Sequence, residues 1–218
     1  MSSVNTLTIK PNTNVSSTIS GNNSTAAFNI DNGDYFTLDG SNVNGGTTKN
    51  LTVDNLNSGG STIRFINDAR NNSVKNCVIR GCSVTSGVIF FSTTTGASGN
   101  DSNLIQNNDI SGTALNGIWN SGTGTTTAAK NSDNKIIGNR IFDFRLRGIA
   151  DFGNSSGTLY EGNEIFSANI QPEGFLVGIE VNSNTIEGFT FRNNYIRDLK
   201  VSGAVPVYGI SLHMIRPS

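Results

Sequence analysis

Few residues of this chain could carry chemistry, and the two acids that could act together stand about one structural repeat apart. They are Asp151 and Glu180, and Arg147 lies just before Asp151. Glycoside hydrolysis needs two carboxyl groups that face one groove, so these three residues are the candidates for a catalytic centre. The simpler interpretation, which we favour here, is that they are solvated charges on a polar face.

The strongest binding candidate is Trp119, the only tryptophan of the chain. It follows an apolar residue, so strand alternation predicts Ile118 inside and Trp119 outside. An outward aromatic ring on a flat sheet is suited to stacking on a sugar ring. The predicted neighbours in its row are Ile89 and Ala150, with Arg64 and Glu180 further along. The simpler alternative is that a long loop covers Trp119 and Ile89 as a small satellite cluster.

Other kinds of site find little support. Cys77 and Cys82 are separated by a segment that reads as a strand, so we expect free thiols rather than a disulfide. The single histidine, His213, provides no partner for a zinc site and is interpreted as incidental. We therefore expect no metal site and no cofactor, although calcium would be compatible with a polysaccharide-active protein.

The composition excludes several classes of function. The net charge of −1 shows no excess of basic residues of the kind that nucleic-acid binding requires. No apolar run approaches the roughly 20 residues that span a bilayer, so no membrane span is expected. The chain opens on Met1-Ser2-Ser3 without a hydrophobic signal core. The expectation is a single domain over residues 1–218, taken from a longer secreted protein.

A glycine followed by an apolar residue returns at intervals of 30, 31, 30 and 31 residues. A period of this size is typical of a stacked repeat architecture. The pairs are Gly87-Val88, Gly117-Ile118, Gly148-Ile149, Gly178-Ile179 and Gly209-Ile210.

A second pattern runs in phase with the first, with an asparagine or a substitute between two apolar residues. Asparagine tolerates the left-handed conformation and bonds to nearby backbone, and stacked amides can bond to one another as a ladder. The predicted ladder residues are Cys77, Asn108, Asn139, Asn163 and Asn194. A related row, Asp109, Arg140 and Glu164, alternates in charge and should help to set the register between coils.

Three short apolar segments in each repeat, rich in Ile, Val and Phe, favour strands over helices. The sequence therefore predicts an all-β fold: a single-stranded, right-handed parallel β-helix of about seven coils with three parallel sheets. In the first 70 residues we expect strands near residues 7–9, 18–19, 28–30, 36–38, 51–53 and 63–65. The segment Leu51–Leu56 also fits the asparagine pattern, so the register there stays open.

The runs DYFTLDGSN, TTKNLTVDNL, STIRFIND and NNSVKNCVIRG resemble right-handed parallel β-helix segments of large secreted or surface proteins, common in Bacteroidota. More distantly, the pattern is similar to the pectate-lyase-like superfold. That superfold includes polysaccharide lyases, hydrolases, phage tailspikes and non-catalytic adhesins, so function has to be argued from a site. The Asp-Asp, Gly-His-Gly and Arg-x-Lys elements that the resemblance would imply for a polygalacturonase-type hydrolase are not present in the sequence.

The leading expectation is a non-catalytic structural or binding module of a secreted bacterial surface protein, located outside the cell or on its surface. It would serve as an adhesin, stalk or glycan-binding segment, with Trp119, Arg147, Asp151 and Glu180 as candidate ligand-binding residues. Its partners would be a glycan or another cell-surface polymer, and its ends could stack on further copies into a fibre. The alternatives are a polysaccharide lyase or glycoside hydrolase, and a tailspike fragment.

Overall fold

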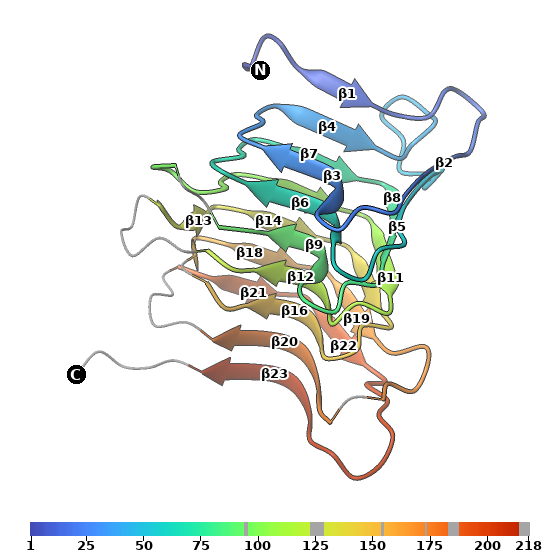
Figure 1. Cartoon of the computed structure of the whole chain (residues 1–218), viewed down its shortest axis with the longest axis vertical. Coiled ribbons are helices and arrows are strands. Elements are labelled where there is room, and N and C mark those ends of the chain that lie inside the picture. Colours follow the sequence, from blue (N-terminus) through green and yellow to red (C-terminus); the bar gives the residue numbers. More distant parts are fainter. Residues whose placement is uncertain (94–95, 123–128, 154, 173, 183–187, 214–218) are drawn as a thin grey trace.

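The chain winds into a right-handed parallel β-solenoid, as the sequence predicts (Figure 1). The computed structural model describes residues 1–93, 96–122, 129–153, 155–172, 174–182 and 188–213. This part of the chain contains almost no helix. Each of the three main sheets has seven strands, so about six turns separate the first strand of a sheet from its last.

Each coil contributes one strand to each sheet, and all main pairings are parallel. Sheet 1 contains β1 (Leu7–Ile9), β4 (Phe36–Asp39), β7 (Ser73–Lys75), β10 (Leu104–Gln106), β14 (Lys135–Ile137), β18 (Leu159–Glu161) and β21 (Thr190–Arg192). Sheet 2 contains β2 (Ser17–Gly21), β5 (Leu51–Asn55), β8 (Cys77–Gly81), β11 (Asp109–Gly112), β15 (Arg140–Phe142), β19 (Glu164–Phe166) and β22 (Tyr195–Arg197).

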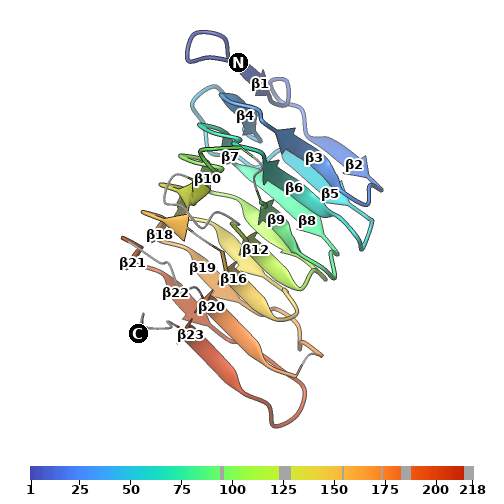
Figure 2. The ribbon, with the colours of Figure 1, turned by 60° about the vertical axis from the view of Figure 1, so that its left-hand side comes forward.

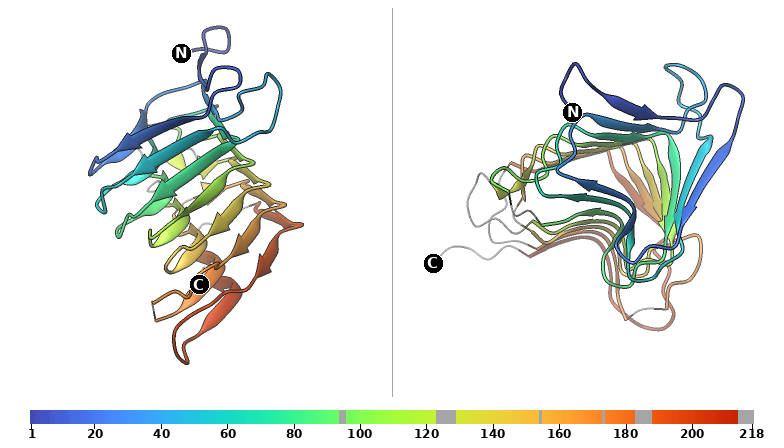
Figure 3. Two further views of the ribbon diagram at one scale, coloured as in Figure 1. Left: turned by 90° about the vertical axis from the view of Figure 1, so that its right-hand side faces the viewer. Right: turned by 45° about the horizontal axis from the view of Figure 1, so that its top comes forward.

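Sheet 3 contains β3 (Ala26–Asp31), β6 (Ser61–Ile66), β9 (Gly87–Phe91), β12 (Asn116–Asn120), β16 (Arg147–Asp151), β20 (Leu176–Asn182) and β23 (Val207–His213). A short pair, β13 (Asn131–Ser132) and β17 (Ser155–Ser156), forms a fourth sheet between sheets 3 and 1. Figures 2 and 3 show the strands stacked coil on coil, and the view from the top in Figure 3 shows three sheets around one interior. The six strands predicted in the first 70 residues are confirmed.

Rows of like side chains fill the interior, because parallel strands in constant register place equivalent residues above one another. One row of sheet 2 is isoleucine in five successive coils, from Ile79 to Ile196. Rings also stack in the interior, with Phe65 and Phe91 at a centroid distance of 4.8 Å and Tyr160 and Phe191 at 4.9 Å. Both cysteines are free thiols, as expected.

The predicted asparagine ladder lies at the corner between sheets 1 and 2. The Oδ1 atom of Asn139 accepts bonds from the backbone N–H and the Nδ2 of Asn108, both at 3.0 Å. The Nδ2 of Asn108 also donates to the carbonyl of Val74 in the preceding coil at 2.9 Å. The same pattern repeats at Asn163 and Asn194. Cys77 occupies the first position and donates only its backbone N–H to the ladder, at 2.9 Å.

Two further ladders, which the sequence analysis missed, line the corner between sheets 3 and 1. In one, Asn72 donates to Asn103, and Asn103 donates to Asn134, through both backbone and side-chain nitrogens. In the other, Asn100 donates to Asn131 in the same two ways. Each strand of sheet 1 in these coils is therefore held at both of its ends by amide side chains.

The residue before each predicted ladder position has a positive φ. These values are 57° at Asn76, 51° at Asn107, 63° at Gly138 and at Gly162, and 56° at Asn193. Asparagine and glycine enter this left-handed region more easily than other residues. The corner thus uses two adjacent residues, one to turn the chain and one to bond to the next coil.

Four of the five predicted glycines, Gly117, Gly148, Gly178 and Gly209, lie in one row. The fifth, Gly87 in β9, is displaced by one residue. Gly117 lies level with Gly148, and Gly148 with Gly178, because Ile118, Ile149 and Ile179 are paired. In β9, however, Gly87 pairs with Asn116, and Ile89 pairs with Ile118. Val88 therefore occupies the position that was assigned to Gly87.

The alternating charges on the outer face of sheet 2 also lie as predicted. Arg140 contacts Asp109 at 3.5 Å and Glu164 at 3.1 Å. Lys49 and Arg197 extend the row at its two ends, at 2.7 Å from Asp109 and 2.8 Å from Glu164. Such partly exposed pairs stabilise by at most about 1 kcal/mol each, so their main effect is on register.

Among the residues described, no helix combines the length and the apolar character that crossing a bilayer requires.

Asn139→Ala tests the ladder. The substitution removes the acceptor of the Asn108 N–H and of one Nδ2 hydrogen of Asn108, and it removes the side-chain donor to the carbonyl of Ile105, all in a buried corner. The other Nδ2 hydrogen of Asn108 keeps its bond to the carbonyl of Val74. At about 1–3 kcal/mol for each buried unpaired group, we expect the free energy of unfolding to fall by about 3 kcal/mol or more in urea titrations. Asn194→Ala is the matched control, since Asn194 is half-buried and water can replace its bonds. Equal losses in both variants would contradict a structural role for the ladder.

Gly148→Ala tests the glycine row. A Cβ at Gly148 would lie 2.5 Å from the Cγ2 of Ile165 and 2.7 Å from the carbonyl oxygen of Gly178. We expect a loss of about 1–3 kcal/mol from this overpacking, measured by thermal unfolding. Gly209→Ala, in the last coil of the same row, meets no atom within 4 Å and should change stability by less than about 0.5 kcal/mol.

Candidate functional site

Trp119 lies on the outer face of sheet 3, as predicted, but beside a different neighbour. Its Cα partners are Phe90 in β9 and Ala150 in β16. The prediction of Ile89 is wrong, because Ile89 is fully buried in the core opposite Ile118. A shift of one residue in the pairing exchanges the two faces of a strand, and the misassigned Gly87 produced that shift.

Phe90 and Trp119 form a stacked aromatic pair on this face. Their ring centroids are 5.2 Å apart, and the planes are inclined by 27°. Arg64 is the Cα partner of Phe90 on the other side, so one row carries a guanidinium and two rings on three successive coils. Both rings and the arginine are half-buried.

These three residues border a shallow depression of about 300 Å³. The rest of its lining consists mainly of hydroxyl side chains from the turns between sheets 2 and 3 and from the first residue of β6, namely Ser24, Thr25, Thr85, Ser86 and Ser61. Two of these hydroxyls are bonded to each other, with 2.7 Å between the Oγ atoms of Ser61 and Ser86. We call this depression, with Arg64, Phe90 and Trp119, the aromatic platform.

Two nitrogen donors of the platform have no hydrogen-bond partner among the described residues. They are the indole Nε1 of Trp119 and the Nε of Arg64, and both atoms are buried. A buried unpaired donor costs about 1–3 kcal/mol, and such groups in a native protein often point to a bound molecule or water. The one hydrogen bond that the Arg64 side chain makes to the described part of the chain runs from Nη2 to the Oγ of Ser92 at 3.3 Å.

Arg147 and Glu180 meet on the same face, as an ion pair between the Nε of Arg147 and a Glu180 carboxylate oxygen. The guanidinium lies over the rings of Phe152 and Phe175, at 4.7 and 5.0 Å from their centroids. The two side chains are only 16% and 9% exposed. The two charges therefore pair with each other, and the guanidinium of Arg147 also packs on two aromatic rings.

His213 is near this pair and is not isolated. Its Nε2 lies 3.6 Å from Glu180 and 2.9 Å from the Oγ of Ser211. A Ser–His–acid relay needs the hydroxyl and the carboxylate on opposite ring nitrogens. Here one nitrogen makes both contacts, so this arrangement does not form such a relay.

Asp151 does not join Arg147 and Glu180, because its side chain lies inside the solenoid. Its Cα partners are Asn120 and Val181, whereas Glu180 is level with Ala150. The carboxylate is fully buried and accepts bonds from Ser155 Oγ at 2.7 Å, Tyr160 Oη at 2.7 Å and Asn120 Nδ2 at 3.2 Å. Burial raises the pKa of Asp151 to about 6, although these three bonds favour the charged form.

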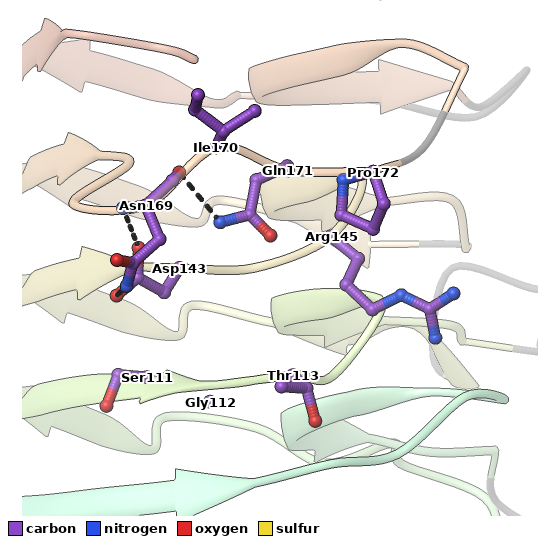
Figure 4. Close-up of a pocket in the computed structure, with 9 residues that line it drawn as sticks. All are labelled: Ser111, Gly112, Thr113, Asp143, Arg145, Asn169, Ile170, Gln171 and Pro172. Atoms are coloured by element: carbon purple, nitrogen blue, oxygen red, sulfur yellow. Dashed lines mark hydrogen bonds between the residues drawn. The ribbon is translucent and has the colours of Figure 1, made fainter. Parts of the chain in front are cut away.

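A concavity larger than the platform lies elsewhere, against the connection between β19 and β20, and has a volume of about 530 Å³ (Figure 4). Asn169 forms its upper wall and donates from its backbone N and its Nδ2 to the two carboxylate oxygens of Asp143, at 2.9 and 3.0 Å. The Nε2 of Gln171 donates to the carbonyl of Asn169 at 3.0 Å. No repeating motif indicates this groove, because its wall is the connection between β19 and β20, which is longer than the equivalent connections of the earlier coils.

No group of three or more His, Cys, Asp and Glu side chains within the described ranges could hold a metal ion. Comparisons with protein-family models, with curated proteins and with solved structures found no match.

Asp151→Asn tests the buried carboxylate. Because its pKa is raised in the folded chain, Asp151 stabilises the fold most below about pH 4, and this contribution is lost as the pH rises through about 6. The amide cannot ionise, and the hydroxyls of Ser155 and Tyr160 can accept as well as donate. When the pH rises from 4 to 8, we expect the free energy of unfolding of the variant to fall by up to about 3 kcal/mol less than that of the natural chain. Urea titrations at both pH values measure this, and parallel pH profiles would contradict it.

Proposed function

We propose that this chain is a non-catalytic module of a secreted bacterial surface protein and that it binds a glycan at the aromatic platform. The observation that carries the proposal is the stacked pair of Phe90 and Trp119, set beside Arg64 in an open depression ringed by hydroxyls. The same scaffold could serve as a stalk or an adhesin, in keeping with its rigid stacked coils.

The chemistry of the platform suits a sugar. A pyranose ring presents a C–H face that packs on an aromatic ring and hydroxyl groups that need both donors and acceptors. Phe90 and Trp119 offer the apolar surface, while Ser24, Thr25 and Thr85 offer exposed hydroxyls that act in both ways. Small-molecule sites commonly combine an apolar wall with a few placed polar groups.

The positions of the three charged candidates support binding over cleavage. Arg147 and Glu180 form an ion pair, and the Arg147 guanidinium packs on two aromatic rings. The side chain of Asp151 points into the core. A glycosidase needs two carboxyl groups that face one groove, and these two acids face different sides of sheet 3. A lyase or hydrolase is therefore the alternative that the binding experiment has to test.

The first experiment is a glycan-array screen of the chain, followed by calorimetry on a hit with natural and variant proteins. We expect Trp119→Ala to weaken binding about 30-fold, equivalent to about 2 kcal/mol. Gln171→Ala, in the groove of Figure 4, is the matched control and should bind like the natural chain.

Each outcome of that experiment decides between the alternatives. Loss of binding in Trp119→Ala alone supports the aromatic platform. Loss in Gln171→Ala alone moves the site to the groove and overturns the proposal. A hit recovered as cleaved product establishes an enzyme, and an unaltered hit that binds both variants equally excludes both surfaces.

A further inference from the structure

Arg64 stands apart from most other arginines of the chain, because it has no acidic partner among the described residues. Six others in the described ranges lie within ion-pair distance of a carboxylate: Arg70, Arg80, Arg140, Arg147, Arg192 and Arg197. Within the same ranges, the side chain of Arg64 makes one hydrogen bond, to a neutral serine, and its buried Nε has no partner. A half-buried guanidinium without a counter-charge is costly, which singles out this residue.

The surroundings of Arg64 add no negative charge. Besides Arg64, the described residues that line the depression are serine, threonine, glycine and the two aromatic residues, and none of them is aspartate or glutamate. The other arginine of sheet 3, Arg147, differs in this respect, because its pair with Glu180 satisfies it internally. The positive charge of the platform therefore faces the depression without compensation.

We infer that the ligand of the aromatic platform carries an anionic group, a carboxylate or a sulfate, and that Arg64 selects it. This inference rests on the proposed glycan site. The planar guanidinium offers paired donors that match such a group, which makes arginine the residue best suited to it. The ring that bears the group would stack on Phe90 and Trp119, because the three side chains lie in one row on adjacent coils.

The test compares three probes of equal length: a uronic-acid tetrasaccharide, its neutral methyl ester and a sulfated neutral tetrasaccharide. We expect the natural chain to bind at least one anionic probe about 10-fold or more tighter than the ester in 50 mM salt. The preference should shrink at high salt because the ions screen the charge. The two anionic probes separate a carboxylate ligand from a sulfate ligand.

Variants separate this inference from the proposed function. Arg64→Gln should reduce the anionic preference to within about 2-fold, because it weakens binding of the anionic probes more than binding of the ester, while Trp119→Ala should weaken all probes alike. Arg80→Gln is the control, since Arg80 is exposed on sheet 2 beside Asp54 and outside the platform. A thermal melt of each variant checks that it is folded.

The outcomes are distinct. If Trp119→Ala weakens binding but the three probes bind equally, the platform stands and the role of Arg64 is overturned. The same holds if Arg64→Gln keeps the anionic preference. If Trp119→Ala leaves the binding of every probe unchanged, or if none of the probes binds, the proposed site and this inference fall together.

Discussion

The bond on which this fold depends is the one from an asparagine side chain to the coil next to it. Where a strand of sheet 1 ends, the backbone turns through a left-handed residue, and the groups at the turn would be left unpaired in a buried corner. Each ladder Oδ1 accepts two of those donors from the preceding coil, and each Nδ2 returns a bond to a carbonyl there. One side chain thus fixes both the spacing and the phase of two coils.

The constant register between coils brings the residues of the aromatic platform together. Arg64, Phe90 and Trp119 are far apart in the chain, yet constant register places them side by side at the spacing of parallel strands, about 4.8 Å. No loop has to fold around a ligand to assemble them. On the same face, Arg147 and Glu180 are not Cα partners, but their side chains reach each other across adjacent strands and form an ion pair. Arg64, by contrast, has no acidic partner among the described residues.

The sequence predicted most of the repeating parts, but two repeating ladders were missed, and so were features at places where the repeat is interrupted. The strands, the first ladder and the charge row were found because their period is nearly constant. The second ladder has the same signal, with Asn103 and Asn134 each five residues before a predicted ladder residue, but a single row had been taken to explain the asparagines. The spacing of Gly87 and Gly117 predicts Ile89 on the outer face, whereas Gly87 pairs with Asn116 and Ile89 therefore lies inside. The groove of Figure 4 depends on the long connection between β19 and β20, which has a counterpart in the next coil, where Gln171 pairs with Val201, but none of that length between sheets 2 and 3 in the earlier coils.

Asp151 shows why alternation alone does not determine which residues are inside. The interior row that contains it begins with Ile30, Phe65 and Phe91 and then turns polar at Asn120 and Asp151. The amide of Asn120 links Asp151 to Asn131 of the neighbouring ladder, so the polar layer joins sheet 3 to the corner that follows it. A fully bonded buried network restricts the arrangements open to a chain more than an apolar layer does. In a solenoid whose coils are otherwise nearly interchangeable, such a layer distinguishes the fourth and fifth coils from the rest and opposes slippage by a whole repeat.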